Sequence, residues 1–190
     1  MFAIESLALD AKVTAKRQVA ALCSLALGLL ISFSPLAALA AAPTVTVTEK
    51  IDLNQAPAQS WAAIRDFMGW PTWHPAFAGT KLLKGEANTK GSVRLLTAKD
   101  GAQFTEELVA YDAAARSYQY RILESPAPVI GYVSTIEVKE TSTGSTVVWS
   151  STFKVKPGTP EEAAKKAIAG IYRLGLDNLA AAAKQGGEYR

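Results

Sequence analysis

The residues with the clearest chemical potential are one carboxylate and one histidine. Glu106 lies among apolar and aromatic residues, where an ionised carboxylate is unfavourable unless it is paired. We therefore expect either a raised pKa or a partner for Glu106, namely a ligand, a water molecule or Arg94. His74 is the only histidine of the chain and is flanked by aromatic residues. Its ordinary pKa would suit a general base at neutral pH.

Both side chains have a second interpretation. A shift of one residue in strand register would turn Glu106 to solvent and Glu107 inward, although the pattern favours Glu106 inward. For His74, packing between Trp73 and Pro75 is favoured over a functional role. The sequence offers no further histidine as a metal partner. It also contains no phosphate-binding glycine loop, nucleophile elbow or HExxH pair. We predict no metal and no other cofactor.

Secondary-structure elements must position these residues, and the sequence after residue 43 predicts them. Residues 44–51 alternate apolar and polar side chains, which is typical of a half-buried strand. Asn54 is expected to cap a short helix over 56–67, and the prolines of 69–75 to enclose a second short helical turn. Six further strands, separated by turns too short for helical crossovers, are predicted over 80–83, 92–98, 103–111, 117–123, 132–140 and 145–155.

The C-terminal part predicts a long amphipathic helix that ends near residue 185. Thr159 is expected to cap it, with Pro160 in the first turn and two acidic residues at the positive helix end. One stripe of the helix carries Ala164, Ile168, Ile171, Tyr172, Gly175 and Leu179. The order of elements predicts an α+β fold, in which a curved antiparallel sheet of seven strands packs on this helix.

The N-terminus is typical of an export signal. The basic residues end at Arg17, and the apolar run over 19–33 is shorter than the roughly 20 residues that span a bilayer. Small residues follow, and we predict cleavage after Ala40. We expect a signal peptide over 1–40, a domain over 43–186, and a periplasmic or secreted protein without a stable membrane span after cleavage. The alternative is an uncleaved N-terminal anchor.

Composition narrows the range of partners. The formal net charge of +3 in 190 residues is too small for a typical nucleic-acid-binding surface, so we expect no nucleic-acid partner. Cys23, the only cysteine, lies inside the predicted signal peptide. The mature domain would therefore contain no disulfide and would depend on its core for stability.

The element order and several residues resemble a known family. Trp61, the segment 70–75 (WPTWHP) and the segment 106–112 (EELVAYD) resemble the bacterial polyketide cyclase/dehydrase group of the START/Bet v 1-like (SRPBCC) superfamily. The segments 105–106 and 132–134 are similar to a branch that includes MxaD-like proteins and abscisic acid receptors. The resemblance implies a helix-grip fold with a cavity between the sheet and the C-terminal helix.

The resemblance also implies which residues bind a ligand. Glu106, Tyr132 and Ser134 match pocket positions of the receptor-like branch, and His74 is a further candidate anchor near the expected pocket mouth. Strand alternation and the helix stripe then add the walls of the cavity. These wall residues are Phe104, Leu108, Tyr120, Ile122 and Ile171.

Three functions follow from the resemblance. We expect an exported binding protein for a small, largely apolar molecule. The first alternative is a cyclase or dehydratase without a metal, in which Glu106 and His74 serve as acid and base. The second is an MxaD-like periplasmic accessory protein that acts on a protein partner. The sequence leaves the ligand and the oligomeric state open.

Overall fold

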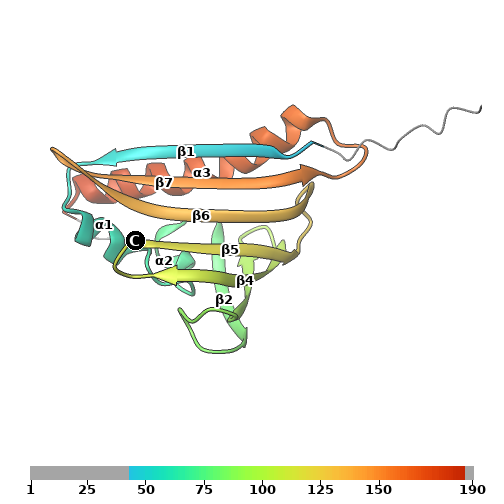
Figure 1. The fold of residues 1–190 in the computed structure, drawn as a ribbon, viewed down its shortest axis with the longest axis horizontal. Helices are drawn as coiled ribbons and strands as arrows, with labels where there is room; N and C mark the ends of the chain where they lie inside the picture. The colour runs from blue at the N-terminus through green and yellow to red at the C-terminus, as the bar shows by residue number, and fades with distance from the viewer. Residues whose placement is uncertain (1–42, 187–190) are drawn as a thin grey trace, which may run out of the picture. The chain divides into compact units, whose positions relative to one another are not determined.

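The computed structural model describes residues 43–186, and the predicted signal peptide lies outside these residues. Seven strands and three helices make up the described part (Figure 1). The strands are β1 (Val45–Leu53), β2 (Phe77–Lys84), β3 (Val93–Ala98), β4 (Gln103–Asp112), β5 (Ser117–Glu124), β6 (Val129–Thr141) and β7 (Gly144–Val155). The helices are α1 (Pro57–Ile64), α2 (Trp70–Trp73) and α3 (Glu161–Lys184).

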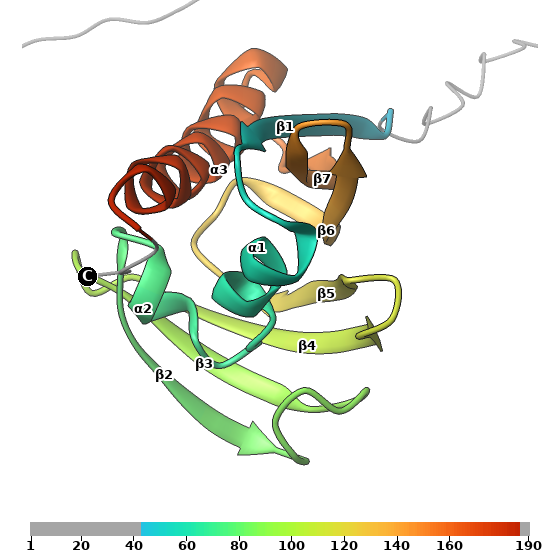
Figure 2. The ribbon, with the colours of Figure 1, turned by 90° about the vertical axis from the view of Figure 1, so that its left-hand side faces the viewer.

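The strands form one antiparallel sheet in the order β1-β7-β6-β5-β4-β3-β2. The strands from β2 to β7 pair with their neighbours in sequence, while β1 lies beside β7 at one edge and β2 forms the other edge. The chain therefore crosses from edge to edge between β1 and β2, and α1 and α2 lie on this crossing (Figure 2). The predicted α+β helix-grip fold is confirmed.

The sheet curves towards α3, as Figure 2 shows, and the stripe of α3 is mostly buried. Trp149 of β7 stacks on Tyr172 of α3, with ring centroids 4.4 Å apart and an angle of 14° between the rings. The stripe differs from the prediction at two positions, because Ile171 is 36% exposed and Leu176, which was not predicted, is fully buried. Ile171 thus lies at the border of the buried face.

The helix starts correct two sequence predictions. Neither Asn54 nor Thr159 caps a helix, since the residues at the cap positions are Ala56 and Pro160, which make no side-chain cap. At α1 the Gln59 side chain instead accepts the Ala56 N–H at 3.2 Å. In α1 the first turn begins with Pro57, whose backbone angle φ suits a helix and which has no N–H to satisfy. In α3, Pro160 is itself the cap residue, with an extended backbone, and does not lie in the first turn as predicted.

The first helix is also shorter than predicted. It ends at Ile64, and the N–H of Phe67 donates to the Asn88 side chain at 2.7 Å rather than continuing the helix. Phe67 remains fully buried, so the apolar spacing that predicted a longer helix reflects burial of the following loop.

Candidate functional site

A cavity of about 270 Å³ lies between the sheet and α3. Its wall includes residues of α2, β4, β5, β6, β7 and α3, and most of its surface is apolar. The loop after β5 contributes Pro126, Ala127 and Pro128, and the turn between β3 and β4 contributes Asp100 and Ala102. The cavity is therefore built by both layers of the fold and by two loops.

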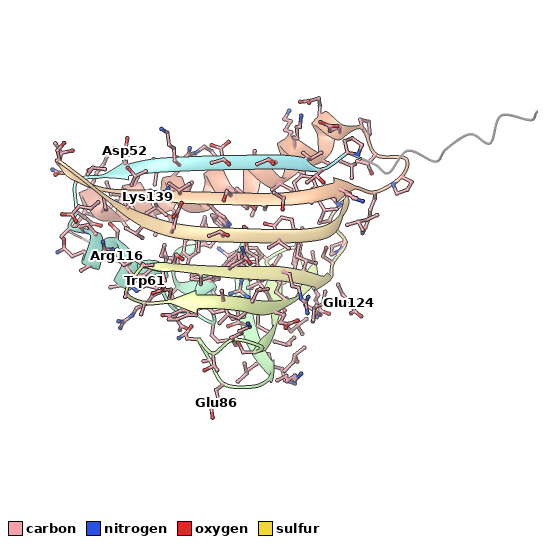
Figure 3. The ribbon with its side chains drawn as sticks, viewed as in Figure 1. Asp52, Trp61, Glu86, Arg116, Glu124 and Lys139 are labelled. Carbon is pink, nitrogen blue, oxygen red and sulfur yellow. The ribbon has the colours of Figure 1, made fainter. Side chains whose placement is uncertain are left out.

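Figure 3 shows the end of the sheet where these loops lie. The label Glu124 marks the last residue of β5, directly before the loop with Pro126, while Trp61 and Arg116 lie at the opposite end of the sheet. At that opposite end, the ring of Trp61 packs against Tyr111 and Tyr118. The loop residues of the cavity wall therefore lie at the Glu124 end.

The structure brings six of the nine predicted site residues into the cavity wall. They are Phe104, Glu106, Tyr120, Ile122, Tyr132 and Ile171. The other three, Leu108, Ser134 and His74, are buried but do not line the cavity. Their predicted ligand contacts, like those of the six wall residues, stay predictions.

The predicted inward register of Glu106 is confirmed. Glu106 is 3% exposed, whereas Glu107 points to the other face and pairs with Arg121 at 2.6 Å. Of the expected partners, the structure shows Arg94, which follows from the pairing of residues 94 and 106 in neighbouring strands. Arg94 Nε and Nη2 donate to Glu106 Oε2 at 2.9 and 2.6 Å.

The surroundings of Arg94 explain how a charged pair is tolerated in the core. Its side chain is fully buried, and Nη1 donates to the Phe67 carbonyl oxygen. The guanidinium lies 3.9 Å from the ring centroid of Phe67 and 4.1 Å from that of Trp70, a cation–π arrangement. Burial raises the pKa of Glu106, and the Arg94 charge opposes this rise. Because neutral Glu106 would leave a buried cation uncompensated, we assign the ionised pair at neutral pH.

A cluster of hydroxyl groups, three of them from tyrosines that line the cavity, forms the second polar group of the site. The hydroxyl of Tyr132 contacts those of Tyr120, at 3.3 Å, and of Tyr172. Tyr172 in turn contacts Ser134 Oγ at 3.1 Å, and Trp149 Nε1 donates to Tyr120 and Ser134 at 3.1 and 3.0 Å. Burial raises the pKa of each of the three tyrosines well above its ordinary value, so all three are neutral phenols.

Tyr172 and Trp149 were not among the predicted site residues. The sequence did contain a signal for both. Tyr172 lies on the apolar stripe of the last helix, and Trp149 lies on the same face of its strand as the inward residues Val147 and Phe153. Ser150, on the other parity of β7, is only partly buried. Alternation and helix periodicity placed these rings in the interior, but they could not indicate that their polar atoms meet.

His74 is a packing residue rather than a wall residue. Its Nδ1 accepts the Ala76 N–H at 3.2 Å, so Nε2 carries the proton and donates to the Ile171 carbonyl oxygen at 3.0 Å. The ring stacks on Trp70 at an angle of 11° and is 1% exposed. Burial lowers the pKa of His74 to about 4, so the imidazole is neutral at pH 7.

Replacing His74 by glutamine should remove part of the acid sensitivity of the protein. The pKa is about 4 in the folded protein and 6.5 as the ordinary value. The unfolded chain therefore binds the proton first, and stability is full above pH 6.5 and falls as the pH drops towards 4. We expect the wild type to lose about 2 kcal/mol from this group between pH 7.5 and pH 5.

The measurement is urea unfolding of wild type and His74→Gln at both pH values. The wild-type loss should exceed that of the variant by about 2 kcal/mol. Glu106, whose raised pKa acts with the opposite sign, is present in both proteins and cancels in this difference. Equal losses in the two proteins would show that His74 does not carry the effect.

Within residues 43–186, no group of three or more histidine, cysteine, aspartate or glutamate side chains is arranged to hold a metal ion. In the same part of the chain, every helix is too short or too polar to span a bilayer.

Sequence comparison identifies the family. Residues 44–184 match the family described as polyketide cyclase / dehydrase and lipid transport. The chain belongs to this family. The predicted membership in the START/Bet v 1-like superfamily is thereby confirmed, and with it a fold family whose ligands are lipids and other hydrophobic molecules.

Solved structures of similar proteins agree with this assignment. XoxI from Bacillus cereus is 34% identical with a TM-score of 0.65, and the match covers 73% of this chain and 94% of XoxI. A protein from Bacillus thuringiensis is 32% identical with a TM-score of 0.65, covering 75% of this chain and 99% of that protein. Ara h 8.0201, at 18% identity and a TM-score of 0.63 over 75% of this chain and 99% of its own, shares the fold.

Proposed function

We propose that this member of the polyketide cyclase / dehydrase and lipid-transport family is an exported protein that binds a small, largely apolar molecule in the cavity between the sheet and α3. The observation that carries the proposal is the mainly apolar cavity of about 270 Å³. Ligand pockets typically measure roughly 300–1,000 Å³, so this one lies at the small end. A molecule with one or two rings, or a short chain, suits it better than a lipid with two long chains.

The positions of the polar residues favour binding over the cyclase or dehydratase alternative. That alternative needs Glu106 and His74 as an acid and a base at one substrate. His74 lies outside the cavity wall, and both of its ring nitrogens are engaged by backbone groups. Glu106 is paired with Arg94. The two groups therefore cannot act as an acid and base pair on one bound molecule, because His74 does not reach the cavity and ionised Glu106 has no proton to donate.

Export is proposed from the predicted signal peptide over 1–40. It is tested by the mass of the protein recovered from the periplasm or the medium. A mature chain that begins at Ala41 supports export, and a full-length chain confined to the cytoplasm contradicts it.

Filling the cavity should weaken the binding of an apolar probe. Ala167 of α3 is exposed but lines the cavity, so a phenylalanine ring there can turn into the space. We expect purified wild-type protein to bind naphthalene in isothermal titration calorimetry and Ala167→Phe to bind at least about tenfold more weakly, a loss of about 1.4 kcal/mol.

The matched control is Ala163→Phe, one turn earlier in α3. Ala163 is exposed and does not line the cavity, so this variant adds the same ring outside the site. It should bind naphthalene like the wild type. Absence of naphthalene binding by the wild type, or equal loss in both variants, would overturn the proposed use of the cavity.

A further inference from the structure

The hydroxyl cluster has a defined direction of hydrogen bonding. The Ser134 hydroxyl donates to the Ser150 carbonyl oxygen at 2.8 Å, so its single proton is used there. Its contact with Tyr172 at 3.1 Å must then be a hydrogen bond in which Tyr172 donates. By the same reasoning Tyr132 donates to Tyr172, and Tyr120 donates to Tyr132.

This direction uses every hydroxyl proton of the cluster. Four protons, those of Tyr120, Tyr132, Tyr172 and Ser134, serve the four hydrogen bonds among these groups and the Ser150 carbonyl. Any other direction would place two oxygen atoms in contact without a proton between them. The phenol oxygens of Tyr120 and Tyr132 each retain a lone pair, whereas neither has an O–H left to offer.

The remaining polar groups of the wall follow the same pattern. The indole N–H of Trp70 donates to Tyr118 at 3.0 Å, and that of Trp149 is engaged by Tyr120 and Ser134. Both bonds from Arg94 go to Oε2 of Glu106, and within residues 43–186 no hydrogen bond is made by Oε1. Arg94 itself is fully buried and does not line the cavity.

In the described part of the chain, the side chains of the wall therefore present acceptors and no free donor. We propose that the cavity selects a neutral, apolar molecule that carries a hydroxyl group, such as a phenol or an apolar alcohol, and discriminates against carboxylates and against molecules whose polar atoms only accept hydrogen bonds. This inference rests on the proposed function of the cavity and adds the chemical class of its ligand.

The physical reason is that an acceptor ligand cannot be satisfied without loss. A carbonyl or ether oxygen can obtain a proton from these side chains only if one of the buried hydroxyl bonds is broken, whereas a ligand hydroxyl adds a bond to a lone pair that is already free. A carboxylate would in addition face the ionised Glu106, while Arg94 has no surface in the cavity.

The test is a series of naphthalene derivatives measured by isothermal titration calorimetry on the wild-type protein at pH 7. We expect 2-naphthol to bind at least about tenfold more tightly than 2-methoxynaphthalene. The methoxy compound should bind no more tightly than 2-ethylnaphthalene, which matches it in size, and 2-naphthoate should bind more weakly than naphthalene. Equal affinities for 2-naphthol and 2-methoxynaphthalene would overturn the inference and leave the proposed function intact. If naphthalene itself does not bind, the proposed function fails first.

A variant tests the direction of the cluster independently. In Tyr132→Phe the proton of Tyr120 loses its acceptor and becomes available to a ligand. The preference for 2-naphthol over 2-methoxynaphthalene should therefore fall at least about fivefold, and the methoxy compound should gain relative to 2-ethylnaphthalene. Tyr111→Phe, whose hydroxyl lies outside the cavity wall, should keep the wild-type preference. An unchanged preference in Tyr132→Phe, with a thermal unfolding transition that shows it folded, would refute the assigned direction.

Discussion

Replacing Glu106 by glutamine should lower the free energy of unfolding by about 3–5 kcal/mol, because it leaves a fully buried cation without its counter-charge. Arg94 is 0% exposed and its guanidinium is always protonated. Its remaining contacts are the Phe67 carbonyl oxygen and the faces of two aromatic rings, which cannot replace a carboxylate. Urea unfolding at pH 7 measures the effect.

A double variant separates the burial of charge from loss of packing. Arg94→Met with Glu106→Leu removes both charges and keeps apolar groups of similar length, so it should be at least about 2 kcal/mol more stable than Glu106→Gln. The partly exposed pair of Glu107, also on β4, and Arg121 of β5 provides a matched control, and Glu107→Gln should change stability by less than about 1 kcal/mol. If the double variant were as unstable as Glu106→Gln, the loss would come from packing.

The same pair limits how the ligand site can be probed. A Glu106 variant that fails to bind a ligand could fail because the core is disturbed, since Glu106 is a wall residue and the partner of a buried arginine. Variants at Ala167 or Tyr132 change the cavity without leaving a charge unpaired. These variants therefore test the proposed ligand binding more directly than a Glu106 variant does.

The features of the fold that the sequence predicted correctly share one physical basis. Strand alternation placed Phe104, Glu106 and Tyr120 on one face, because a strand with one buried face must keep its register. Helix periodicity placed Ile168 and Tyr172 on the face towards the sheet in the same way. Short-range patterns are sufficient where burial alone decides the orientation of a side chain.

The parts that sequence reasoning missed depend on contacts between distant residues. The hydroxyl cluster joins Ser134 of β6 to Tyr172 of α3, and no local pattern specifies that two hydroxyl groups 38 residues apart will meet. His74 was expected near the pocket mouth, but the close approach of α3 encloses it. The caps expected from Asn54 and Thr159 were wrong because the cap positions fall slightly later in the chain, at Ala56 and Pro160.

Replacing Gly175 by alanine should destabilise the protein by about 2 kcal/mol or more, although alanine is the better helix former. A Cβ atom at Gly175 would lie 2.4 Å from Cδ2 of His74 and 3.0 Å from Cζ3 of Trp73. Both rings are buried and packed against Trp70 and Trp149, so neither can move away without disturbing the core. The helix would have to shift, which would also strain the hydrogen bond from His74 to the Ile171 carbonyl.

Gly170 of the same helix gives the opposite expectation and hence the control. It is exposed, and a Cβ atom there would meet nothing within 4 Å. Gly170→Ala should therefore stabilise the protein by about 1 kcal/mol through helix propensity alone. Urea unfolding of both variants should show shifts of opposite sign. The two substitutions are chemically identical. A stabilising effect at both positions would therefore mean that α3 lies farther from His74 than the packing shows. The wall that Ile171 and Tyr172 contribute to the cavity would then be displaced as well.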